Sequence, residues 1–130
     1  MILKETKLVV SDNSGAKKVK CIKIFGGSVK KYATLGDLIL VSIRKKKKLK
    51  KLKKVNQKKV LKKKIYFAFI ITTKKKKKRK TGHSINFQQN KVILANNDDK
   101  LIGTRIIGPI CLELRKKNKF KIVAMAKASI

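Results

Sequence analysis

The chain is poor in the residue types from which catalytic and metal sites are built. Its 130 residues include no tryptophan, one proline, one histidine and two cysteines. His83 has no carboxylate or cysteine close to it in the sequence, so it offers neither a metal-ligand set nor an activated nucleophile. Cys21 and Cys111 form no CxxC pattern, which argues against a zinc site or a disulfide framework and predicts two small buried hydrophobic residues. We expect no catalysis, no metal and no cofactor.

Long apolar runs are also missing. The longest, at residues 65–71, is too short to cross a bilayer, and no amphipathic helix or lipid-attachment motif is visible. The first seven residues lack the apolar core of a secretory signal and the Arg- and Ser-rich composition of an organelle presequence. We expect no membrane association and a protein that works where it is made.

Acidic residues are scarce, with 6 Asp and Glu against 38 Lys and Arg, and the formal net charge is +32. Self-repulsion at this charge opposes a compact fold unless a polyanion neutralises it. Phosphate backbones do so while releasing condensed counterions, which makes nucleic acid the leading partner and gives no support to a small-molecule substrate. Only residues 44, 79, 105 and 115 are Arg, so most of the charge is carried by Lys, a point charge that does not read base edges as a planar guanidinium does.

Short apolar segments separated by Gly, Asn, Asp and Lys predict a mainly β fold, a sandwich or a barrel. We expect strands at about 7–10, 19–25, 38–44, 64–73, 84–87 and 92–94. The strand at 65–73 is apolar on both faces and is expected at the centre of the core. The Asp-Asn-Ser-Gly sequence at 12–15 predicts a turn, in which the hydroxyl of Ser14 is expected to bond either to the turn or to RNA.

A helical tail is expected at about 109–130. Ile110, Leu114 and Arg115 fit a short helix with Pro109 near its first turn, and Phe120 and Val123 fit a second amphipathic turn.

Two lysine-rich runs, at 45–64 and 74–80, each follow an apolar strand. They are expected to be loops or strand extensions that become ordered only against phosphate, because blocks of like charge repel one another. The length suits one domain, residues 1–130, with basic insertions at about 45–64 and 74–82.

Several blocks of sequence occur in a specific order. The blocks in the first part of the chain are Asp12-Asn13-Ser14-Gly15-Ala16-Lys17-Lys18, residues 21–27, Tyr32-Ala33 and Gly36-Asp37. Those in the second part are Thr73-Lys74-Lys75, residues 92–97, Gly103-Thr104-Arg105-Ile106-Ile107-Gly108-Pro109 and Glu113-Leu114-Arg115. Together they resemble the family of the universal large-subunit ribosomal protein fourteen across nearly the whole chain. The resemblance implies a small five-stranded β-barrel with a short C-terminal helical tail, acting as a structural constituent of the large ribosomal subunit.

The resemblance also implies partners and sites. The partners are large-subunit rRNA, small-subunit rRNA across the subunit interface, neighbouring large-subunit proteins and a ribosome-silencing factor. We assign to rRNA binding Lys17, Lys18, Lys30, Lys31, Tyr32, Arg44, Lys74, Lys75, Arg79, Arg105 and Arg115. The subunit-bridge or silencing-factor surface is assigned to Asn97, Thr104, Arg105 and Lys121. Phe87 is expected in the core, whereas Tyr32 fits the core and stacking on a base about equally well.

The chain departs from the family pattern at several points. A lysine-rich stretch at 45–54 stands where the family usually has a proline-containing segment, and Phe87-Gln88-Gln89-Asn90 replaces the usual Phe-Asp-Gly-Asn. These departures and the excess of Lys over Arg are typical of an A+T-rich genome. We expect an organelle-encoded mitochondrial protein, with a plastid or the bacterial cytoplasm as alternatives. The rival function is a free-standing basic barrel that compacts DNA or accompanies transcription.

Overall fold

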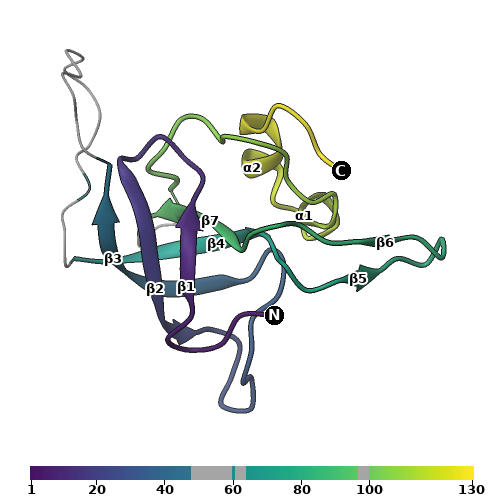
Figure 1. The fold of residues 1–130 in the computed structure, drawn as a ribbon, viewed down its shortest axis with the longest axis horizontal. Coiled ribbons are helices and arrows are strands. Elements are labelled where there is room, and N and C mark those ends of the chain that lie inside the picture. The colour runs from purple at the N-terminus through teal and green to yellow at the C-terminus, as the bar shows by residue number, and fades with distance from the viewer. Residues whose placement is uncertain (48–59, 61–63, 97–99) are drawn as a thin grey trace.

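The computed structural model describes residues 1–47, 60, 64–96 and 100–130. Five strands form a closed barrel in the order β1-β2-β3-β4-β7 (Figure 1). Their bounds are β1 Lys7–Val10, β2 Ala16–Ile24, β3 Leu38–Lys46, β4 Ile65–Thr72 and β7 Lys91–Ala95. Neighbouring strands are antiparallel except β1 and β7, whose parallel pairing closes the barrel. The mainly β fold and the five-stranded barrel are confirmed.

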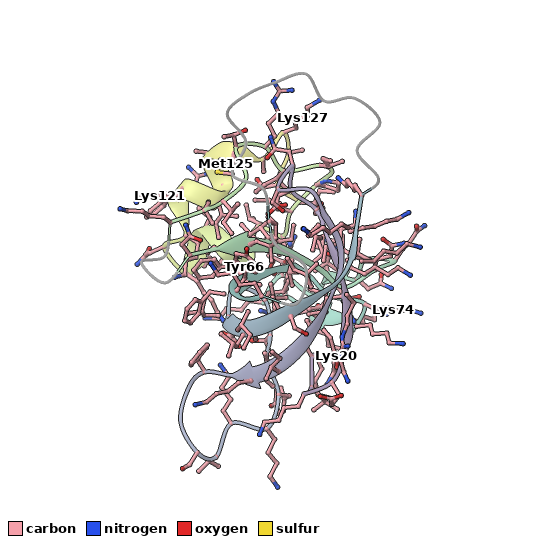
Figure 2. The ribbon with its side chains drawn as sticks, turned by 90° about the vertical axis from the view of Figure 1, so that its left-hand side faces the viewer. Lys20, Tyr66, Lys74, Lys121, Met125 and Lys127 are labelled. Carbon is pink, nitrogen blue, oxygen red and sulfur yellow. The ribbon has the colours of Figure 1, made fainter. Side chains whose placement is uncertain are left out.

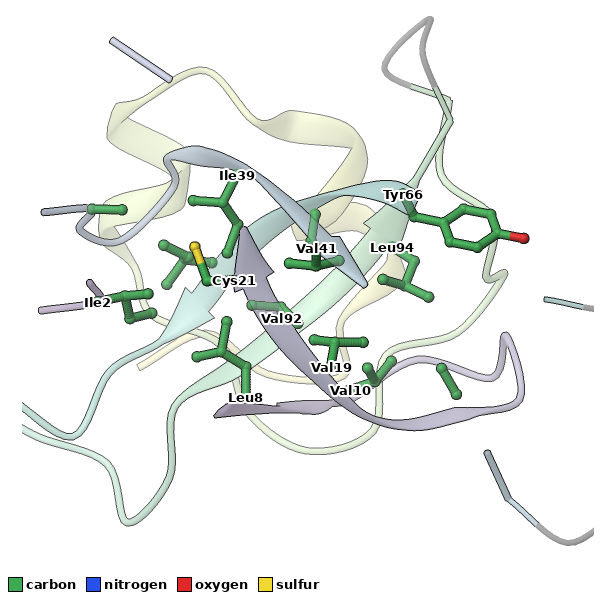
Figure 3. Close-up of a cluster of buried hydrophobic side chains, with 14 of the residues drawn as sticks. Ile2, Leu8, Val10, Val19, Cys21, Ile39, Val41, Tyr66, Val92 and Leu94 are labelled. Carbon is green, nitrogen blue, oxygen red and sulfur yellow. The ribbon is translucent and has the colours of Figure 1, made fainter. Parts of the chain in front are cut away.

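The inside of the barrel is filled by alternate residues of each strand, because successive side chains of a strand point to opposite faces. Figure 3 shows this packing, in which the labelled side chains are Ile2, Leu8, Val10, Val19, Cys21, Ile39, Val41, Tyr66, Val92 and Leu94. Both cysteines are buried and free, as expected. Phe87 packs against this core as a partly buried side chain.

The outer face of β4 and β7 carries a second core. Phe69 and Ile71 of β4 pack there with the tail residues Ile110, Leu114 and Ile122. Burying a side chain of this size contributes about 1.5–3 kcal/mol, so this cluster holds the tail on the barrel. The prediction that both faces of β4 are covered is confirmed from Tyr66 onward, but Ile65, at the strand's first position, is 53% exposed.

The tail contains two short helices, α1 Glu113–Lys116 and α2 Phe120–Met125, which lie above β7 and β4 in Figure 1. The prediction that Pro109 lies near the first turn of a helix is wrong, because α1 begins only at Glu113. Ile110 instead pairs in parallel with Ser129, with the Ile110 N–H donating to the Ala128 carbonyl at 3.0 Å and the Ile130 N–H to the Ile110 carbonyl at 2.9 Å. Backbone groups used in this pairing are not available to a helix.

The two lysine-rich runs differ. Most of the run at 45–64 lies outside the described residues, but Lys45 and Lys46 continue β3. In the second run, β5 Lys77–Lys78 pairs with β6 Ser84–Ile85 in a separate two-stranded hairpin that projects from the barrel (Figure 1). The predicted strand at 84–87 is therefore shorter than expected and does not belong to the barrel. Among the described residues, no helix has the length and apolar character needed to cross a membrane.

Candidate nucleic-acid interface

Helices cover one side of the barrel, whereas the outer surface of β1, β2 and β3 carries basic side chains. We call these residues the basic face: Lys7, Lys17, Lys18, Lys20, Arg44 and Lys45. Lys20 is half-buried and the others are exposed. Their neighbours Leu8, Val19 and Ile43 point into the barrel, and strand alternation turns Lys7 and Lys20 outward. The pairing of β2 with β3 is irregular around Lys18, where the consecutive residues Lys17 and Lys18 are both exposed, as are Arg44 and Lys45 on β3. Figure 2 shows Lys20 on the side of the barrel away from α2, which carries Lys121 and Met125.

The strand register brings lysines of the basic face directly opposite one another. Lys7 of β1 pairs with Lys20 of β2, and Lys18 of β2 pairs with Lys45 of β3. Directly opposed like charges destabilise a sheet by a few tenths to about 1 kcal/mol per pair. The arrangement becomes favourable when a polyanion lies across the strands, because each phosphate then sits between cations.

Carboxylates do little to neutralise the basic face. Of the acidic residues, Asp98 and Asp99 lie outside the described part of the chain. Glu5 is exposed and forms an ion pair with Lys20 at the edge of the face. Asp12, Asp37 and Glu113 are largely buried and bond to backbone or side-chain groups within the fold. The described surface therefore carries a large excess of positive charge.

Asp37 fastens the loop that carries Lys30, Lys31 and Tyr32. Its carboxylate lies 2.8 Å from Lys30 Nζ and 2.9 Å from Lys117 Nζ, and it accepts the Thr34 N–H at 2.8 Å. Burial alone would raise the pKa of Asp37, but the bonds from Lys117 and Lys30 lower that pKa to about 2. Lys31 is exposed and Tyr32 is 49% exposed, so the tyrosine ring is not a core residue and remains available for stacking.

Arg79 directly follows β5, at the start of the turn that joins β5 to β6, and its side chain reaches the tail. Its guanidinium donates two hydrogen bonds to the Glu113 carboxylate, at 2.9 and 3.2 Å, and a third to the Ile130 carbonyl at 2.7 Å. Burial would raise the pKa of Glu113, but the bonds from Arg79 and from the Cys111 thiol lower it to about 2. The assignment of Arg79 to RNA is not tested by this geometry, which shows that the side chain ties the hairpin to the tail. Lys74 and Lys75, in the same segment, are exposed, as is Arg115 on α1.

The residues assigned to the subunit-joining surface come from two segments. Thr104 and Arg105 are exposed and follow Gly103, and Lys121 is exposed on α2. Ile106 and Ile122, which follow Arg105 and Lys121, are both buried in the second core. Asn97 lies outside the described residues.

The residues assigned to rRNA binding from the sequence did not include Lys7 and Lys20, and Lys45 was expected to meet phosphate only as part of the lysine-rich run at 45–64. The alternation in residues 7–10 and 19–25 places Lys7 and Lys20 outward and could have identified them. Their juxtaposition depends on the strand register, which the sequence does not state. Within the described part of the chain, no group of three or more His, Cys, Asp or Glu residues could hold a metal ion.

A closed five-stranded barrel with one apolar face under two short helices and another face lined by lysines defines a class of small, strongly basic β-barrel proteins. Within that class, the model of the family described as ribosomal protein L14p/L23e matches residues 1–130, which is the whole chain. The chain belongs to the ribosomal protein L14p/L23e family. It is therefore a structural ribosomal protein of the large subunit, whose partners are ribosomal RNA and ribosomal proteins.

Proposed function

We propose that the chain binds large-subunit rRNA through the basic face and contributes to bridges with small-subunit rRNA through Thr104, Arg105 and Lys121. One observation carries the first part. Lys7 and Lys20, like Lys18 and Lys45, stand directly opposite one another on strands that no other element of the described chain covers. Such pairs oppose folding in isolation and favour it when phosphates lie across them.

The chemistry of these side chains suits positioning more than sequence reading. Lysine ammonium groups neutralise phosphates as point charges and carry little base specificity. Folded RNA is recognised largely by its shape and backbone, and a rigid barrel holds its cations at fixed places to meet that shape. Lys30, Lys31, Lys74 and Lys75, on exposed loops, extend the contact beyond the basic face, and Tyr32 adds a ring for stacking.

The proposal includes further partners and a location. Neighbouring large-subunit proteins contact the chain, and a ribosome-silencing factor docks on Thr104, Arg105 and Lys121. The excess of Lys over Arg, with only four Arg among 38 basic residues, supports an organelle-encoded mitochondrial protein. The alternative of a free-standing DNA-compacting barrel is less favoured than the ribosomal function, because the ribosomal family model covers the entire chain.

A charge-matched pair of double variants tests the main proposal. Lys7→Gln with Lys18→Gln removes two charges from the basic face, and Lys116→Gln with Lys127→Gln removes two exposed charges from the tail. We expect the first double variant to reduce the slope of log affinity for large-subunit rRNA against log salt by about 1.5, since each lost phosphate contact changes it by roughly 0.7–0.9. The second should leave the slope nearly unchanged. Equal slopes for both variants, or equally tight binding to duplex DNA, would contradict the proposal.

A further inference from the structure

The segment of Thr104 and Arg105 belongs to no helix or strand, yet a side chain far away in the sequence fixes its backbone. The Asn13 Oδ1 accepts the Thr104 N–H at 2.8 Å and the Arg105 N–H at 3.3 Å. The Asn13 Nδ2 donates to the Thr104 hydroxyl at 2.8 Å. One amide therefore makes three hydrogen bonds to two consecutive residues, which leaves that stretch of backbone little freedom.

The turn that carries Asn13 is itself held firmly. Asp12 is 1% exposed, and its carboxylate accepts the Leu94 N–H of β7 at 2.8 Å and the Ser14 N–H at 3.0 Å. Ser11 is joined to the other end of the segment, because its carbonyl accepts the Ile107 N–H at 2.7 Å and its hydroxyl donates to the Ile107 carbonyl. Asn13 thus projects from a turn that is anchored to β7 through Asp12 and to Ile107 through Ser11.

Gly103 allows the two segments to approach each other. A Cβ at this position would lie 2.8 Å from the Asp12 Cβ and 2.9 Å from the Asn13 Oδ1. Contacts this short are not tolerated between buried atoms, so only glycine lets the amide of Asn13 reach the following two N–H groups. The three hydrogen bonds of Asn13 therefore depend on the close approach that Gly103 permits.

We infer that Asn13 is a positioning residue for the Thr104–Arg105 surface, and that it holds Arg105 in the orientation that meets a phosphate of small-subunit RNA. This inference rests on the proposed function of that surface. A guanidinium binds phosphate through a planar fork, so its affinity depends on orientation more than that of a lysine ammonium does. A fixed backbone lowers the ordering cost of such a contact.

The first measurement tests only the three hydrogen bonds from Asn13 to Thr104 and Arg105, which we call the Asn13 clamp. Hydrogen exchange at the Thr104 and Arg105 amides of the full chain is compared for the wild type, Asn13→Ala, Asn13→Asp and Asn90→Ala. Asn90 is the matched control, since its Oδ1 accepts the Lys74 N–H at 2.7 Å in another part of the barrel. We expect Asn13→Ala to speed exchange at the two amides about fivefold to tenfold, the effect of losing one ordinary hydrogen bond. Asn13→Asp keeps an acceptor for both N–H groups and should restore protection, while Asn90→Ala should leave both amides unchanged.

The second measurement concerns docking. Large subunits assembled with each variant are mixed with purified small subunits, and the association constant is measured by light scattering. Asn13→Ala should weaken association by about the same factor as Arg105→Ala, and the double variant should be no weaker than Arg105→Ala alone. Asn90→Ala should associate like the wild type.

Each result decides the inference. Unchanged exchange in Asn13→Ala would overturn it, as would faster exchange with unchanged association in a protein whose Arg105→Ala variant does lose association. Weaker capture of a silencing factor with normal subunit association would overturn the assignment to RNA. If Arg105→Ala itself associates normally, the proposed function of the surface fails, and the exchange data still decide whether Asn13 positions the segment.

Discussion

Arg105 differs from the other cations of this protein in how it is presented. It follows a backbone stretch held by Asn13, whereas the lysines at 74–78 form an exposed run of similar side chains. In such a run the loss of one charge is compensated by its neighbours. Arg105 stands between Thr104 and Ile106 in the sequence, so no adjacent residue carries a charge that could replace its own.

A charge reversal at Arg105 should therefore have a larger effect than one within the run. We expect Arg105→Glu to weaken subunit joining at least about tenfold, the size of one charge-assisted contact, and Lys76→Glu to weaken it by much less. The measurement is the yield of joined particles at a series of magnesium and salt concentrations. Equal effects of the two reversals would place the joining surface elsewhere.

Asp37, like Glu113, has a lowered pKa that makes the stability of the fold depend on pH. Its pKa is lowered from 3.8 to about 2 in the fold, so the folded state binds the proton more weakly than the unfolded chain. The contribution to stability is complete above about pH 4 and is lost as pH falls toward 2. Its side chain is 12% exposed, and we expect Asp37→Asn to lower the free energy of unfolding by about 2 kcal/mol at neutral pH.

The difference between the wild type and Asp37→Asn should shrink as pH falls from 4 to 2 in urea denaturation experiments. Glu5→Gln is the control, because Glu5 is 71% exposed and pairs with Lys20 at the surface, where ion pairs contribute about 0–1 kcal/mol. A pH-independent difference for Asp37→Asn would show that the residue acts through packing and not through its charge.

At the scale of single residues, the sequence identifies chemistry better than partners. The strong positive charge follows directly from composition, and the burial of Cys21 and Cys111 was predicted correctly. The interaction of Arg79 with Glu113 was not predicted, because the two residues are 34 positions apart and only the folded tail brings them together. The clamp of Asn13 on Thr104 spans 91 positions and escaped the sequence for the same reason.

At the scale of elements, the lysines of the basic face lower the stability of the free protein and favour its binding to rRNA. The opposed pairs of Lys7 with Lys20 and Lys18 with Lys45 repel one another in the free protein. Lys7→Gln with Lys18→Gln should therefore raise the free energy of unfolding of the free chain at low salt by about 0.4–2 kcal/mol in total, since each of the two relieved pairs contributes roughly 0.2–1 kcal/mol.

This gain should decrease as salt screens the charges, and it should accompany weaker binding to rRNA. Urea denaturation of the free protein at low and high salt measures the first effect. Lys116→Gln with Lys127→Gln provides the comparison for removal of net charge alone. Equal stabilisation by both double variants would show that the total charge matters and the cross-strand register does not.

The barrel strands were the most predictable elements, because β1, β2 and β3 contain short apolar segments separated by Gly, Asn, Asp and Lys. The β5–β6 hairpin was less predictable, since Lys77 and Lys78 have no apolar pattern and their pairing is supported by the fold around them. The start of α1 was misplaced because Pro109 resembles a helix start. The parallel pairing of Ile110 with Ser129 decides the conformation of that segment, and it is a contact that the local sequence does not show.

At the scale of the whole molecule, two cores share one sheet. The inside of the barrel forms the first, and the outer face of β4 and β7 under the tail forms the second. The apolar residues on both faces of β4 predicted this arrangement, and the tail supplied the cover. The uncovered strands are then the only part of the described sheet with room for a large polyanion, so the position of the tail determines where RNA is expected to lie.

The parallel pairing of β1 with β7 has a consequence for the order of events during synthesis. Val9 pairs with Lys91 and Val10 with Val92, so β1, the first barrel strand to be synthesised, cannot pair with β7 until β7, the last barrel strand, has been made. Until residue 95 has left the ribosome that makes it, the nascent chain can form only an open sheet with an unpaired edge. During most of its synthesis the chain is thus a highly cationic open sheet. Early binding to ribosomal RNA or to a chaperone would protect its unpaired strand edge from aggregation.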